Sequence, residues 1–89
     1  MARYVALVDG RPGAIGIVVP DLPGCTSGGA TVGAALRSAV EAVTLWIEDA
    51  LADGEKIPNP RSAEKLRNHP AVAAALAQDG TLARVPLTR

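Results

Sequence analysis

The chain has 89 residues and a mass of 9.1 kDa, which permits one domain of ordinary size. Nine basic residues balance nine acidic ones, so the chain lacks the net positive charge that is typical of proteins whose main partner is a nucleic acid. One cysteine and one histidine exclude an internal disulfide framework and a histidine cluster. Because no segment has the pattern of a membrane span or a signal peptide, we expect a cytoplasmic protein. A core this small is marginal, so we also expect a homo-oligomer, a dimer or a tetramer.

Two short apolar runs open the chain, residues 4–8 and 15–19. The turn formers Asp9-Gly10 and Pro12-Gly13 lie between them, which predicts a β-hairpin with a loop of four to six residues. Residues 25–29 resume an extended path after two prolines, and we interpret them as a short third strand.

A long apolar pattern of period 3.6 begins after Thr31, a residue type favoured at the N-cap. It predicts a helix to about Ala52, with Gly54 as the left-handed C-cap. The predicted buried stripe consists of Val32, Leu36, Val40, Val43, Ile47, Ala50 and Leu51, flanked by Ala39 and Trp46. The opposite face is mostly polar and carries one conspicuous apolar residue, Leu45.

The last third of the chain contains two closely spaced prolines in residues 57–60, which predict a rigid extended connector. Ser62 follows this connector and is a residue type that caps helices, which predicts a short helix after it. Residues 71–78 are rich in alanine without a clear amphipathic pattern, so the sequence is compatible with a helix or a loop there. Residues 81–87 predict a closing strand, which Pro86 places at a sheet edge or ends. The order is β-β-β-α-β, an α+β fold with a single, mainly antiparallel sheet covered by one long helix.

Charge is unevenly distributed along the chain. Residues 21–58 contain six acidic and two basic residues, a sum of −4, whereas residues 59–89 contain five basic and two acidic ones, a sum of +3. Two interpretations of this asymmetry are open. The charged residues lie on ordinary solvent-exposed surfaces, or the acidic segment forms a surface for a basic partner.

One segment is dense in residues with fixed backbone roles: Pro20-Asp21-Leu22-Pro23-Gly24-Cys25-Thr26-Ser27-Gly28-Gly29-Ala30-Thr31. It resembles the PDLPGC-x-S-x-G-x-T stretch of the HicB-like antitoxins, including their short stand-alone members. The likeness continues with Ala35-Leu36, Ala42, Trp46, Asp53-Gly54 and Ile57-Pro58-Asn59-Pro60. It covers residues 3–60, and residues 81–87 correspond to the family's last strand.

The resemblance implies a partial ribonuclease-H-like (HicB-like) domain that binds and neutralises a HicA-like toxin, a small mRNA-cleaving protein. Many members of the family add a C-terminal DNA-binding domain. Because this chain ends at Arg89, we expect residues 1–89 to form a single HicB-like domain with no such addition and no direct DNA binding. The alternative is an orphan oligomeric scaffold or regulatory subunit of the same fold with a different partner.

Enzymatic interpretations have little support in the sequence. Cys25 and His69 are the residue types of a nucleophilic dyad, and Asp9 and Asp21 those of a metal site. The simpler interpretation makes Cys25 a small buried residue, His69 a surface residue and Asp9 part of a turn. We therefore expect no catalysis, no cofactor and no metal.

Two surfaces compete as the contact for a protein partner. The first, slightly favoured for its exposed backbone and acid, is the turn Asp21, Leu22, Pro23, Gly24, Cys25, Thr26 and Ser27. The second is the acidic helix face with Glu41, Leu45, Glu48 and Asp49.

Overall fold

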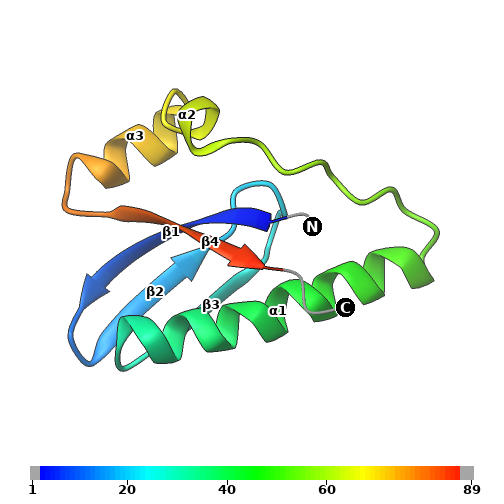
Figure 1. Cartoon of the computed structure of the whole chain (residues 1–89), viewed down its shortest axis with the longest axis horizontal. Helices are drawn as coiled ribbons and strands as arrows, with labels where there is room; N and C mark the ends of the chain where they lie inside the picture. The colour runs from blue at the N-terminus through cyan, green and yellow to red at the C-terminus, as the bar shows by residue number, and fades with distance from the viewer. Residues whose placement is uncertain (1–2, 87–89) are drawn as a thin grey trace.

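The computed structural model describes residues 3–86 of the chain, with side chains for residues 4–85. In that part, the elements in order are β1 (Arg3–Arg11), β2 (Ala14–Val18), β3 (Thr26–Gly29), α1 (Val32–Ala52), α2 (Ala63–Leu66), α3 (Pro70–Leu76) and β4 (Thr81–Pro86). The strands form one antiparallel sheet in the order β3-β2-β1-β4. In Figure 1, α1 runs along one side of this sheet and α2 and α3 lie on the other. The predicted α+β fold is confirmed.

The connection between β1 and β2 is shorter than predicted. Arg11 pairs with Ala14, so only Pro12 and Gly13 lie outside the ladder, and the expected loop of four to six residues is wrong. Gly13 has φ of +93°, which lets two residues reverse the chain. Asp9 pairs with Gly16 within the strands and is not part of the turn.

The core lies between the sheet and α1. Alternate residues of the strands point to this side, as their period of two requires. The buried cluster is made of Tyr4, Ala6, Val8, Ile17, Val19, Leu22, Cys25, Ala35, Ala39, Val43, Ile47 and Val85. Apart from Tyr4, these residues are aliphatic side chains or the Cys25 thiol, so the core depends on close approach of helix and sheet.

The buried face of α1 differs from the predicted stripe. It is made of Ala35, Ala39, Val43, Ile47 and Ala50. Val32 and Leu51 are exposed, at 48% and 54%, which corrects their expected burial. The start of α1 lies close to β3, since a Cβ on Gly29 would be 2.7 Å from the backbone nitrogen of Ala35. The buried face therefore begins with the small residues Ala35 and Ala39, and the larger Val43 and Ile47 follow further along the helix.

Both predicted caps of α1 are confirmed. The Thr31 hydroxyl accepts a hydrogen bond from the Ala34 backbone N–H at 3.1 Å, and Gly54 has φ of +73°. Ser62 likewise caps α2 by accepting from the Lys65 N–H at 3.2 Å.

The second face of the sheet is covered by α2 and α3. Val5 and Leu7 of β1 are buried there, together with Leu66 of α2 and Val72 of α3. The segment left open by the sequence is a helix, and Pro70 occupies its first turn, where a missing N–H costs nothing. Strand β4 is at the sheet edge and ends at Pro86, as predicted; Leu87 lies outside the described residues.

Candidate partner-binding site

The turn between β2 and β3 is a hydrogen-bonded corner packed into the core. The Val19 N–H donates to the Cys25 carbonyl at 3.0 Å, and the Cys25 N–H donates to the Leu22 carbonyl at 2.9 Å. Leu22 is fully buried and Cys25 is 4% exposed. These two residues of the favoured contact surface therefore do not present their side chains to a partner.

Asp21 is also buried, at 8% exposure, so the expectation of an exposed acid at this turn is wrong. Its Oδ1 accepts from Arg61 Nε at 2.5 Å, and its Oδ2 accepts from the Arg61 backbone N–H at 2.7 Å. A buried carboxylate requires a partner of this kind, because burial removes its hydration. The carboxylate is directed at the connector between α1 and α2 and not at solvent.

A second contact holds the same connector. The Tyr4 hydroxyl donates to the Pro58 carbonyl at 2.5 Å, and Ile57 packs against the core beside it. Burial raises the pKa of Tyr4, and the negative charge of Asp21 raises it further. The extended connector predicted at residues 57–60 is confirmed. The hydrogen bond from Tyr4 holds it against strand β1.

The structure does not assemble the residues of the enzymatic alternatives into a reactive site. Burial raises the pKa of the Cys25 thiol, which keeps it protonated and weakly nucleophilic, and His69 is exposed at the start of α3. Asp9 is exposed on β1 while Asp21 is paired with Arg61. Across the side chains described, no three His, Cys, Asp or Glu residues are grouped as ligands for a metal ion.

The exposed part of the turn is its tip, Pro23 and Gly24, followed by Thr26; Ser27 is half-buried. The indole N–H of Trp46 donates to the Pro23 carbonyl at 2.9 Å, which attaches this tip to the flank of α1. Trp46 itself is half-buried against the core, as expected of an anchor at the edge of the helix stripe.

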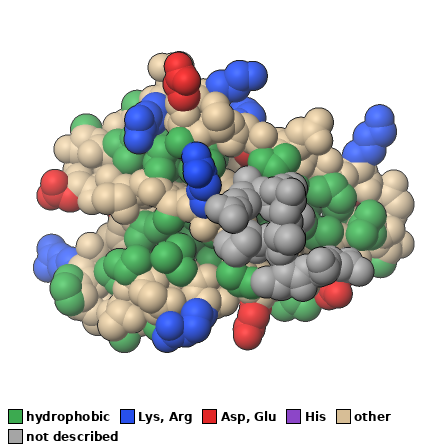
Figure 2. Space-filling view, viewed as in Figure 1, with side chains coloured by type: hydrophobic (Ala, Val, Ile, Leu, Met, Phe, Trp, Pro, Cys, Tyr) green, Lys and Arg blue, Asp and Glu red, His purple; other side chains and the backbone are tan. Residues whose placement is uncertain are grey.

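The second predicted surface, on α1, is open to solvent. Glu41, Leu45, Glu48 and Asp49 are all exposed, and Leu45 is the most exposed of the large hydrophobic residues described, at 60%. Figure 2 shows acidic and basic side chains along the border of the molecule formed by α1, and side chains of both signs, mainly basic, over α2, α3 and β4. Helix α1 itself has three acidic residues and one basic residue, Arg37.

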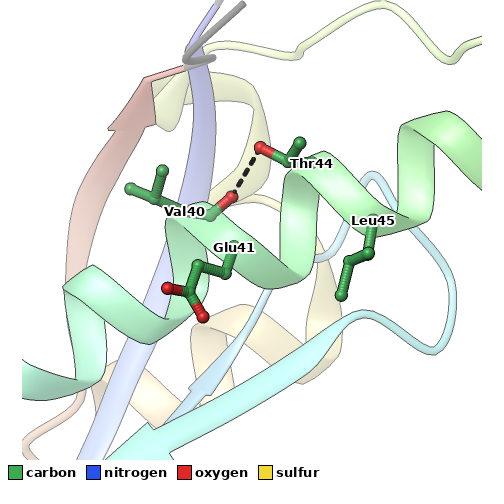
Figure 3. Close-up of a pocket in the computed structure, with 4 residues that line it drawn as sticks. All are labelled: Val40, Glu41, Thr44 and Leu45. Carbon is green, nitrogen blue, oxygen red and sulfur yellow. Dashed lines mark hydrogen bonds between the residues drawn. The ribbon is translucent and has the colours of Figure 1, made fainter.

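A hollow of about 350 Å³ lies on this helix, lined by Val40, Glu41, Thr44 and Leu45. In Figure 3, Val40 and Thr44 point to one side of the helix, and Glu41 and Leu45 point to the other. The Thr44 hydroxyl donates to the Val40 carbonyl at 2.9 Å. The lining is mainly apolar, with one carboxylate at its rim.

Sequence reasoning missed two participants here. Arg61 follows the connector without any periodic signal, and only the rule that a buried carboxylate needs a donor points to it. Val40 was expected to be buried, yet it is half-buried and lines the hollow. Val40 lies there because the face of α1 that contains Ala35 and Ala39, and not the predicted apolar stripe, is turned towards the sheet.

These features define a class: a small α+β domain in which the most exposed large apolar residue described, Leu45, lies on an acidic face of the long helix. The family model for the HicB_like antitoxin of bacterial toxin-antitoxin systems matches residues 4–84. The chain therefore belongs to the HicB-like antitoxin family. The described part contains no helix that is long and apolar enough to cross a membrane.

The chain is also similar to solved structures and to one phage protein. The antitoxin HicB of Burkholderia pseudomallei has a TM-score of 0.80 and 27% identity over 98% of this chain and 64% of its own. A chain of the HicA3 and HicB3 toxin-antitoxin complex has a TM-score of 0.78 at 22% identity, over 98% of this chain and 99% of its own, which shows the fold alone. An uncharacterised 14.9 kDa protein of Haemophilus phage HP1 is 41% identical over 54 residues, 61% of this chain. The match covers only 41% of the phage protein.

Proposed function

We propose that this chain is an antitoxin that neutralises a small HicA-type, mRNA-cleaving toxin by binding it and covering the surface with which it binds and cuts RNA. The observation that carries the proposal is the match to the HicB-like antitoxin family over residues 4–84. A relative of the same fold occurs in a complex of HicA3 with HicB3, which supports a HicA-type partner. We place this activity in the cytoplasm, where the mRNA substrates of such a toxin are found.

Neutralisation of this kind needs no chemistry from the antitoxin. It requires a rigid surface that excludes RNA from the toxin, and the affinity comes from apolar contact and complementary charge. The α1 face presents both features on a helix anchored by the core. We further propose that the chain acts as a homo-oligomer, because a 9.1 kDa domain gains stability when it buries surface against a copy.

The test first looks beside this gene for an open reading frame that encodes a small basic protein, which is the toxin that the proposal expects. Its expression alone should arrest growth and degrade mRNA, and co-expression of the full chain should restore growth. The two proteins should also co-purify at a fixed ratio. If the neighbouring product is harmless, or remains toxic despite the chain, the proposal is wrong and an oligomeric scaffold with another partner becomes the better account.

A further inference from the structure

We infer that Glu41, Leu45 and Glu48 on α1, which we call the acidic stripe, form the docking surface for a basic segment of the protein partner. The partner contributes one apolar side chain that packs on Leu45 beside the neighbouring hollow, and Lys or Arg side chains that pair with the two carboxylates. This inference rests on the proposed function and names the surface that performs it.

The three residues share one line on the helix. They stand at positions i, i+4 and i+7, the spacing that places side chains above one another on one face of an α-helix. Glu41 and Glu48 are separated by about 10 Å along the axis, with Leu45 between them. The hollow of about 350 Å³ adjoins this line and includes Glu41 and Leu45 in its lining. The stripe therefore offers an apolar contact flanked by two negative charges.

The carboxylates of the stripe are available for pairing. Glu41 and Glu48 are exposed, and within the described part of the chain the ion pair present is that of Asp21 with Arg61. Leu45 is 60% exposed, whereas α1 otherwise buries its sheet-facing residues to 5% or less. In the monomer, the Leu45 side chain leaves apolar surface exposed to water. In a complex, a partner would bury that surface, and its basic groups would pair with the two carboxylates.

Charge selects a basic partner over a second copy of this chain. In a two-fold, antiparallel pairing of α1 helices centred on Leu45, Glu41 would face Asp49 of the copy. Helix α1 has three acidic residues against a single Arg37, so such a pairing places like charges together. An RNA-cleaving protein, in contrast, needs a basic surface to hold phosphates. An acidic stripe that pairs with this surface covers the RNA-binding groups directly.

The first experiment measures affinity for the purified toxin that the test of the proposed function identifies. Leu45→Ala and the double variant Glu41→Lys/Glu48→Lys should each weaken binding by about tenfold or more, the scale expected of a central contact. Matched controls make comparable changes on other surfaces: Val18→Ala on the sheet face beside α3, where Val18 is 46% exposed, and Glu64→Lys on α2. The controls should bind as the unchanged chain does, and melting by circular dichroism should show all four variants folded.

The second experiment is independent of the toxin. The full chain is titrated with a synthetic helical peptide that carries Leu flanked by Lys one turn away on each side, and amide NMR shifts are followed. Shifts should concentrate on residues 40–49, weaken with added salt and disappear in Leu45→Ala. Shifts spread over other surfaces, or binding unaffected by salt, would overturn the inference.

The two experiments separate the failure of the surface from that of the function. If the toxin is neutralised and bound equally by the stripe variants, the function stands and the stripe is not the contact. If the peptide binds the stripe but no toxin is neutralised, the proposed function fails while the surface is real. If Leu45→Ala instead lowers the oligomer mass in light scattering, the stripe joins copies of this chain and the inference is wrong.

Discussion

Asp21 and Arg61 lie 40 residues apart in the chain and are joined twice, through the side-chain Nε at 2.5 Å and the backbone N–H at 2.7 Å. The contact links the corner after β2 to the connector after α1. The Asp21 side chain is 4% exposed and that of Arg61 is 44% exposed, so the acid is held inside while the base reaches it from the surface. The acid of the PDLPGC segment is thus a structural residue in this chain.

Removal of this carboxylate should destabilise the protein. Asp21→Asn weakens two charge-assisted hydrogen bonds, and we expect the free energy of unfolding to fall by about 1 to 3 kcal/mol. Urea denaturation followed by circular dichroism measures the loss. Asp9→Asn, which changes an exposed acid of β1, is the matched control and should have little effect. Equal midpoints for the two variants would show that the link to Arg61 contributes nothing.

A pH dependence follows from Tyr4. Its pKa in the folded protein lies above the ordinary value of 10.0, because of burial first and the charge of Asp21 second. Below pH 10 both states keep the phenolic proton, and stability does not depend on this group. Above about pH 10 the unfolded chain releases the proton while the folded chain retains it, so the free energy of unfolding falls with rising pH until the raised pKa is passed.

The Tyr4→Phe variant isolates this effect. It should lose about 1 kcal/mol at neutral pH, because the hydrogen bond to the Pro58 carbonyl is absent. It should also show a smaller alkaline loss of stability than the unchanged protein. Thermal melting from pH 7 to about pH 11 measures both, and parallel curves over that range would contradict the assignment of the alkaline loss to Tyr4.

Two glycines near the start of α1 should respond in opposite directions to the same change. A Cβ on Gly29 would be 2.7 Å from the Ala35 nitrogen and 3.0 Å from the Ala34 carbonyl carbon, both backbone atoms, so Gly29→Ala must push α1 away from β3. We expect a loss of about 2 kcal/mol or more. Gly33→Ala meets only the end of Arg37 at 3.6 Å and should stabilise the helix by about 0.5 to 1 kcal/mol. Melting temperatures that move in the same direction would refute this packing.

The elements were predictable because local signals agree with the tertiary structure. Thr31 and Gly54 mark the ends of α1 through their own capping chemistry, and the prolines of the connector exclude a helix. The rotation of α1 was not predictable from its apolar residues, since a hydrophobic stripe does not show how closely β3 approaches the start of the helix, where a Cβ on Gly29 would be 2.7 Å from the Ala35 nitrogen. That rotation moves Leu51 into solvent and Ala35 into the core.

The candidate site was predictable only in part, for a related reason. The exposure of Leu45, Glu41 and Glu48 follows from helical spacing alone. The burial of Asp21 depends on where a connector 40 residues later passes, which no local pattern encodes. A segment rich in turn formers therefore predicts an exposed loop, although in the structure this turn is packed against the core.

Trp46 joins the corner to the helix, and two substitutions separate its roles. Trp46→Phe keeps an aromatic ring against the core but loses the hydrogen bond to the Pro23 carbonyl, and should cost about 1 kcal/mol. Trp46→Ala also removes the packing and should cost about 3 kcal/mol, the low end for a large aromatic because the side chain is only half-buried. Urea denaturation gives both values. In Trp46→Phe, the amides of Leu22, Gly24 and Cys25 should exchange with solvent faster while those in the middle of β1 remain protected, since only this turn loses a contact. Uniform acceleration across the sheet would instead mean that the indole stabilises the whole fold and does not specifically hold the turn.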